Sequence, residues 1–213
     1  MSSQTAAKVW GKARVEALSD GVFAIAVTLL VLDIRIPELH RPVSSREAWH
    51  AIATLAPLLF SFFISFILTG SFWFMHHVTF HSLKYVTRAL VFINLAFLMF
   101  VSLLPFSTGL LGKLGPNHPV GLTVYFVNQL ALGLTLNWLW MYAVRRRLLE
   151  EPIADPSMRY MIAAQPLACV LALATVAASP VLSYYAYLIV MLGSRRIARR
   201  RFKALPADAP APL

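Results

Sequence analysis

Charged residues are scarce in this chain, and acidic residues are the scarcest of them. Of the 213 residues only 13% are charged, whereas soluble domains carry about 25%. The deficit extends along the whole chain, so no segment is left for a soluble catalytic domain. The one cysteine, Cys169, excludes an internal disulfide, and a zinc site needs more ligands than it offers. Because Cys169 lies in an apolar run, we interpret it as a packing residue.

Motifs for enzymatic chemistry are also missing. The sequence has no phosphate loop, no glycine-rich dinucleotide motif, no carboxylate pair and no G-x-S-x-G motif around Ser19. A TVGYG-type carbonyl filter is absent as well. We therefore expect no enzyme, no catalytic residue, no bound metal and no cofactor. The net charge of +10 would indicate nucleic acid in a soluble protein, but here the basic residues flank apolar runs, which excludes that partner.

Hydrophobic residues make up 59% of the chain and occur in long runs. A membrane span needs about 20 apolar residues, and in lipid the backbone must satisfy its own polar groups, which favours helices. The composition thus predicts an all-α integral membrane protein with one transmembrane domain over residues 1–203 and a disordered tail over 204–213. The six expected transmembrane helices cover residues 17–36, 48–77, 89–111, 120–144, 161–178 and 182–193.

Basic residues predict the orientation of these helices. One side receives most of them, and the other side receives only Arg35, Arg41, Arg46 and Lys113. The excess of Lys and Arg marks the cytoplasmic side, so both termini are expected there, in a cell membrane, as an even number of spans requires. The basic segment that begins at Arg195 is expected to contact anionic lipid head groups.

Three helices carry polar residues at their expected cytoplasmic ends. Asp20 opens the first apolar run, His77 closes the second, and Asn94 lies early in the third. A charge inside a membrane costs about 2.5–3.5 kcal/mol at the centre, so such residues usually have a partner. One interpretation is that Asp20 only favours the helix dipole. The other, which we prefer because it explains all three sites, is a hydrogen-bond network between the helices.

Two further patterns allow alternative functions. His77 and His81 are four residues apart, and with His76 they offer a haem or metal site, although a third strong ligand and an H-E-x-x-H motif are missing. In the first span Ile25, Leu29 and Leu32 share one helix face, with Thr28 beside it. By spacing alone this apolar stripe is more typical of packing than of a pore.

The sequence resembles the transmembrane-protein-175 potassium channel family, known from endosomes, lysosomes and bacteria. The likeness rests on Arg14-x-x-x-Leu18-Ser19-Asp20, on Phe23-Ala24-Ile25-Ala26-x-Thr28-Leu29-Leu30, on Trp73-x-x-His76-His77-x-x-Phe80, on Asn94 and on Leu104-Pro105-Phe106. It covers the first three spans well, and the last three only by their number and length. One departure is Leu18, where the family normally has phenylalanine.

The resemblance implies a homotetrameric potassium channel in which four copies of the first helix line the pore. Ile25 then matches the narrowest apolar ring, Leu29 and Leu32 match the rings beyond it, and Thr28 matches a hydroxyl layer. A second group of positions matches the network that holds the pore helix, namely Arg14, Ser19, Asp20, Trp73, His77 and Asn94. The alternatives that remain are a secondary carrier, a membrane haem or metal protein, and a structural or lipid-binding protein.

Overall fold

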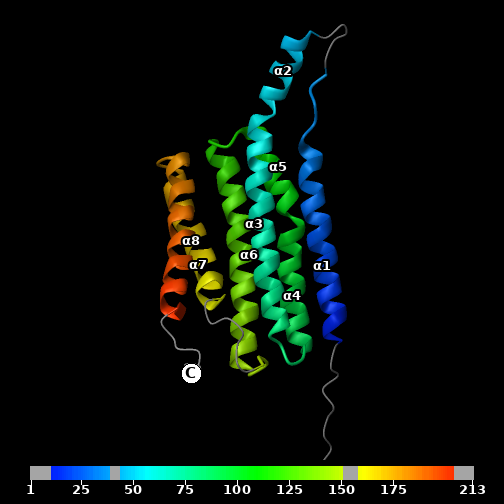
Figure 1. The fold of residues 1–213 in the computed structure, drawn as a ribbon, viewed down its shortest axis with the longest axis vertical. Helices are drawn as coiled ribbons and strands as arrows, with labels where there is room; N and C mark the ends of the chain where they lie inside the picture. The colour runs from blue at the N-terminus through cyan, green and yellow to red at the C-terminus, as the bar shows by residue number, and fades with distance from the viewer. Residues whose placement is uncertain (1–10, 39–43, 151–157, 204–213) are drawn as a thin grey trace, which may run out of the picture.

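The protein is described by a computed structural model that covers residues 11–38, 44–150 and 158–203, and it is a bundle of long helices (Figure 1). The described residues contain no named strand, and an isolated bridge pairs Leu83 with Leu149. The helices in chain order are α1 (Lys12–Leu29), the 3₁₀ helix η1 (Leu30–Asp33), α2 (Ser45–Thr54), α3 (Ala56–His81), α4 (Arg88–Ser102), α5 (Leu104–Leu114), α6 (Pro119–Arg145), α7 (Met158–Val176) and α8 (Pro180–Lys203).

Five of the described stretches are long and apolar enough to cross a membrane. They are Lys12–Asp33, Ala56–His81, Arg88–Leu114, Pro119–Arg145 and Arg159–Val176. A sixth apolar helix, Pro180–Ser194, is shorter, although α8 itself continues to Lys203. The expected tail over 204–213 lies outside the described residues, as do the side chains from 197 onward.

The expected second span, 48–77, is wrong at its start, because two helices meet there. α2 begins after Ser44, whose side chain accepts from the backbone N–H of Glu47 while the Glu47 carboxylate accepts from the backbone N–H of Ser44. Pro57 stands in the first turn of α3, where its missing N–H costs nothing, and so it marks a helix start inside the expected span. As a result α2 extends beyond the bundle, at the top of Figure 1.

The third expected span, 89–111, is one crossing made of two helices. α4 ends at Ser102, and Pro105 lies in the first turn of α5, so the proline again marks a helix start. The break is short, and Arg88–Leu114 still has the length and hydropathy of a single span. α5 continues to Leu114, three residues beyond the expected end of the span.

Pro166 is the one proline inside a described helix, and a neighbouring helix compensates for it. A proline has no N–H to donate to the carbonyl four residues back, which here belongs to Ile162. Asn137 of α6 donates its Nδ2–H to that Ile162 oxygen at 2.5 Å. Gly133, one turn earlier on α6, lets Pro166 approach to 3.1–3.2 Å from where a Cβ would stand. Because lipid offers no hydrogen bonds, this partner allows proline at membrane depth.

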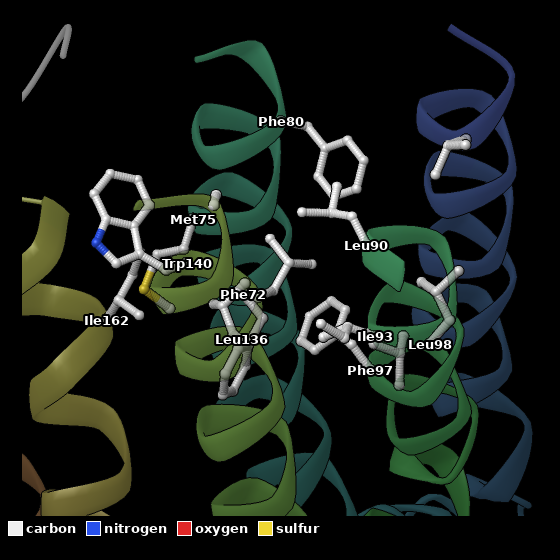
Figure 2. Packing of buried hydrophobic residues seen from close by; sticks show 14 of the residues in the cluster. Phe72, Met75, Phe80, Leu90, Ile93, Phe97, Leu98, Leu136, Trp140 and Ile162 are labelled. Carbon is white, nitrogen blue, oxygen red and sulfur yellow. The ribbon is translucent and has the colours of Figure 1, made fainter. Parts of the chain in front are cut away.

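The helices form one bundle with α1 at one edge and the α7–α8 hairpin at the other (Figure 1). α1 packs on α3 and α4, and α7 packs on α6 and α8. Figure 2 shows part of the main core, where apolar side chains from four helices meet. The side chains labelled there are Phe72, Met75 and Phe80 of α3, Leu90, Ile93, Phe97 and Leu98 of α4, Leu136 and Trp140 of α6, and Ile162 of α7.

α1 begins and α8 ends at the same end of the bundle, the lower one in Figure 1. We call it the Lys12 end, and the opposite one the Asp33 end. At the Lys12 end Lys12 donates its Nζ–H to the carbonyl oxygens of His81 (3.0 Å) and Leu83 (2.8 Å), which have no helical partner after α3 ends. This contact joins the start of α1 to the end of α3.

Candidate functional site

α1 has two faces that differ completely in their surroundings. Its packed face consists of residues three or four apart that are buried against α3 and α4, as expected for one side of a helix. They are Val15, Ser19, Phe23, Ala26 and Leu30. Its exposed face consists of Ile25, Thr28, Leu29 and Leu32, and Ile25 and Leu32 are each 61% exposed. The residues expected to form apolar rings therefore share one uncovered surface.

A chain of hydrogen bonds connects the packed face of α1 to α4 and α3, and each donor in it has one acceptor. The Asn94 oxygen of α4 lies 2.8 Å from Nε2 of His76, and since a carbonyl oxygen only accepts, Nε2 carries the proton. Asn94 Nδ2 donates to the Ser19 hydroxyl at 3.0 Å. Ser19 in turn donates to the carbonyl oxygen of Val15 at 2.9 Å. Three helices are thus joined by side chains that are all buried.

Aromatic side chains surround His76 and orient its imidazole ring. The ring stacks on Phe80 at 4.4 Å and on Phe97 at 5.4 Å between centroids, and Phe23 of α1 is tilted against it at 6.0 Å. Aromatic stacking restricts the ring plane, so Nε2 is held toward Asn94. Phe23 in this way joins α1 to the same cluster through packing.

Asp20 has its own partner on α3. Trp73 of α3 donates its Nε1–H to Asp20 Oδ1 at 2.9 Å. Both side chains are exposed, and they lie at one end of a groove between α1 and α3. The groove is lined by Asp20, Phe23, Ala24, Val27, Phe66, Gly70 and Trp73.

Two of the expected network residues lie elsewhere. His76, not His77, contacts Asn94, because one residue along a helix rotates a side chain by about 100°. His77 is exposed and stacks on Trp73 at 5.5 Å and on His81 at 6.2 Å. Arg14 is exposed, and its side chain makes no hydrogen bond or ion pair with any described residue.

The histidines do not form a metal site within the described residues. No group of three or more His, Cys, Asp or Glu side chains is placed there so that it could hold an ion. His76 is engaged by Asn94, and the rings of His77 and His81 lie face to face rather than converging on a point. The arrangement gives the haem or metal alternative no support.

Thr28 has a specific chemistry on the exposed face. Its hydroxyl lies 3.0 Å from the Ala24 oxygen and 2.9 Å from the Ile25 oxygen, and its proton is donated to these carbonyls of its own helix. The lone pairs of Oγ1 therefore point away from the backbone, and they can accept a hydrogen bond or coordinate a cation. A threonine oriented in this way is an oxygen ligand in an otherwise apolar surface.

At the Asp33 end, α1 has a second contact that the sequence analysis missed. Asp33 of η1 forms an ion pair with Lys113 of α5, with 2.9 Å between Oδ1 and Nζ. The two residues are eighty apart in sequence, and the expected helix boundaries placed them in separate segments. No local spacing rule connects them, so only the packing of η1 on α5 reveals the pair.

The comparisons with known proteins agree with this architecture. The family described as "Endosomal/lysosomal potassium channel TMEM175" matches residues 14–105, which include α1, α3 and α4. A potassium channel of Streptomyces collinus is 38% identical over 146 residues, which are 67% of this chain and 69% of that relative. The endosomal/lysosomal proton channel TMEM175 of Homo sapiens is 39% identical over 99 residues, 44% of this chain and 20% of that protein.

Among solved structures, the crystal structure of a lysosomal potassium-selective channel TMEM175 homologue from Chamaesiphon minutus superposes with a TM-score of 0.72. It is 29% identical, and the match covers 88% of this chain and 97% of that one. Sequence and fold thus agree over nearly the full length of a bacterial relative. The chain is a multi-pass membrane protein and belongs to the TMEM175 channel family.

Proposed function

We propose that this protein is a potassium-permeable cation channel, a homotetramer in which four copies of α1 line the pore. The observation that carries the proposal is the exposed face of α1, which combines Ile25, Leu29 and Leu32 with the oxygen ligand of Thr28. The relative from Streptomyces collinus, at 38% identity, is named a potassium channel, which supports potassium as the permeant ion. α8 is the sixth span, and both termini lie in the cytoplasm of the cell.

Polar groups on α1 argue that this face is covered by protein or water rather than by lipid. Thr28 lies on this face, and Asp20 is exposed beside it at the groove between α1 and α3, where a charge facing lipid is costly. The groove between α1 and α3 lies next to the exposed face and gives a second copy of the chain an apolar surface to pack against. Four copies placed around an axis bring the exposed faces together, whereas a single copy leaves them in the bilayer.

The proposed constriction works by dewetting. A ring of four Ile25 side chains blocks ions without any moving plug, because a narrow apolar pore excludes water. A small rotation or tilt of α1 widens the ring and lets a hydrated ion pass. Selectivity then arises from pore width and the Thr28 oxygens, and it is weaker than that of a carbonyl filter. Basic side chains at the Lys12 end and along the C-terminal segment lie next to anionic lipid head groups.

The test is ion flux through the reconstituted protein. Liposomes with an outward potassium gradient are expected to show flux that depends on the protein, and a pH-sensitive dye in the same vesicles separates potassium from proton movement. Single-channel recording distinguishes a channel from a carrier, because only a channel gives unitary currents. Absence of both flux and unitary currents would overturn the proposal.

Ile25→Ala and Ile25→Asn test the ring itself. Both are expected to raise leak current, because a smaller or polar side chain lets water into the constriction. Ile189→Ala is the matched control, since Ile189 is 69% exposed on α8, at the opposite edge of the bundle (Figure 1). Unchanged conductance in both Ile25 variants would place the constriction elsewhere.

A further inference from the structure

Asp33 and Lys113 hold the Asp33 end of the proposed pore helix to α5. The helix tightens there from α to 3₁₀ over Leu30–Asp33, as is frequent at the C-terminal end of a helix. The Asp33 carboxylate then pairs with Lys113 at 2.9 Å, and their side chains are 32% and 64% exposed respectively. Water therefore reaches the pair, which makes it weak and easy to break.

Because Gly109 has no side chain, it leaves the space that the Asp33 carboxylate occupies. Gly109 lies on α5 one turn before Lys113 and is buried. A Cβ added there would stand 2.7 Å from Cγ of Asp33 and closer still to its Oδ2, so any side chain would have to displace the carboxylate. α5 thus supplies the ammonium group of Lys113 and, at Gly109, the space that the Asp33 carboxylate occupies. The contact is therefore specific and not an accidental surface pairing.

The two ends of α1 are held with very different strength. Near the Lys12 end Ser19 is fully buried and bonded to Asn94, which is itself buried and bonded to His76. At the other end Leu30 is buried, but the ion pair that holds Asp33 is partly exposed. The distance between Asp20 and Asp33 along the helix is about 20 Å, and the whole exposed face lies between them. Movement of that face therefore begins where the anchor is weaker.

We propose that Asp33, Lys113 and Gly109 position the far end of the pore-lining segment, and that release of this contact changes the width of the pore near Leu32. The inference rests on the proposed function, since it assumes that α1 lines the pore. None of the three residues belongs to the exposed face, so they act by placing Leu32 and Leu29 rather than by touching the ion.

Thiol accessibility at Leu32 tests the proposal without requiring ion flux. In a Leu32→Cys, Cys169→Ala background, a membrane-impermeant methanethiosulfonate reagent is applied to the reconstituted protein. Asp33→Asn and Lys113→Gln are each expected to change the modification rate in the same direction, by up to about fivefold, since an exposed ion pair is being lost. The charge swap Asp33→Lys with Lys113→Asp is expected to return the rate toward that of the background.

Gly109→Ala gives an independent arm. It leaves both charges in place but displaces the Asp33 carboxylate, so it is expected to act in the same direction as Asp33→Asn. In the Asp33→Ala background the added methyl group meets no carboxylate, and Gly109→Ala is expected to have no further effect. Matched controls are Glu38→Gln and Lys84→Gln, which remove exposed charges that make no ion pair with a described residue.

Single-channel currents of the same variants give a second readout. Asp33→Asn and Lys113→Gln are expected to change the open probability in the same direction, and the charge swap is expected to restore it. Two results would overturn the positioning role. One is a thiol modification rate and an open probability that equal those of the background in both Asp33→Asn and Lys113→Gln. The other is a charge swap whose effect equals the sum of the effects of Asp33→Lys and Lys113→Asp. If the unsubstituted protein carries no potassium flux while the thiol modification rates change as expected, the proposed function fails, but the positioning role of Asp33, Lys113 and Gly109 is retained.

Discussion

On one face of α1, Phe23 is 2% exposed and lies against His76 and Phe97, whereas Ile25, two residues on, is 61% exposed on the other. Both residues are large and apolar, so hydrophobicity alone does not separate them. In a bilayer, lipid tails are as apolar as side chains, and helices associate through packing and hydrogen bonds instead. The comparison teaches that the packed face holds α1 in place, while the exposed face is free to serve a pore.

Phe23→Ala is the strongest way to break this comparison. Removing a fully buried aromatic ring leaves a cavity between three helices, and we expect a loss of about 3–5 kcal/mol in stability. Ile25→Ala is the matched control and is expected to stay within about 0.5 kcal/mol, because its side chain is exposed. Thermal unfolding in detergent, followed by size-exclusion chromatography, measures both. Equal losses would mean that the two faces do not differ.

Asn94→Leu is expected to have the next largest effect. The substitution keeps the volume but leaves the Nε2–H of His76 without an acceptor and the Ser19 oxygen without a donor. Each buried polar group left without a partner costs about 1–3 kcal/mol. Asn117→Leu, in the exposed turn before α6, is the control and is expected to change stability by about 0.5 kcal/mol or less. A melting temperature unchanged in Asn94→Leu would show that the hydrogen-bond chain does not hold α1.

Thr28→Val sharpens the comparison with the smallest effect on stability. Thr28 is exposed and bonds only to its own helix, so stability is expected to stay within about 0.5 kcal/mol. Selectivity is expected to fall, because valine removes the oxygen that faces the proposed pore. Thr28→Ser keeps that oxygen and is expected to retain the selectivity of the parent. Reversal potentials in potassium and sodium gradients measure the difference, and equal values for valine and serine would remove Thr28 from the selectivity mechanism.

Much of the fold is predictable from the sequence, but helix ends are less so. The apolar runs of the sequence coincide with the five described stretches that are long and apolar enough to cross a membrane, because each run must satisfy its backbone within itself. Pro57 and Pro105 fall inside the expected spans 48–77 and 89–111, and both stand in the first turn of a helix. Hydropathy does not separate a helix from the helix that follows it, whereas proline chemistry at the first turn does.

The candidate site was predictable in its composition and not in its pairings. Ser19, Asp20, Trp73 and Asn94 are all found in hydrogen bonds between helices, as the polar positions in apolar runs indicated. The partner of Asn94 depends on the rotation of α3, which places His76 inward and His77 outward. Asn137 and Ile162, or Asp33 and Lys113, meet only because distant segments pack together.

Composition and hydropathy are enough to identify a helical membrane protein with rare polar residues at set points of its first helices. A low-dielectric solvent permits few charges and requires each span to bond internally. Which of those residues meet, and which face of α1 stays uncovered, depends on how the helices pack. The reason is that a turn of about 100° per residue and the packing of helices against one another, not hydrophobicity, select the partner of each side chain.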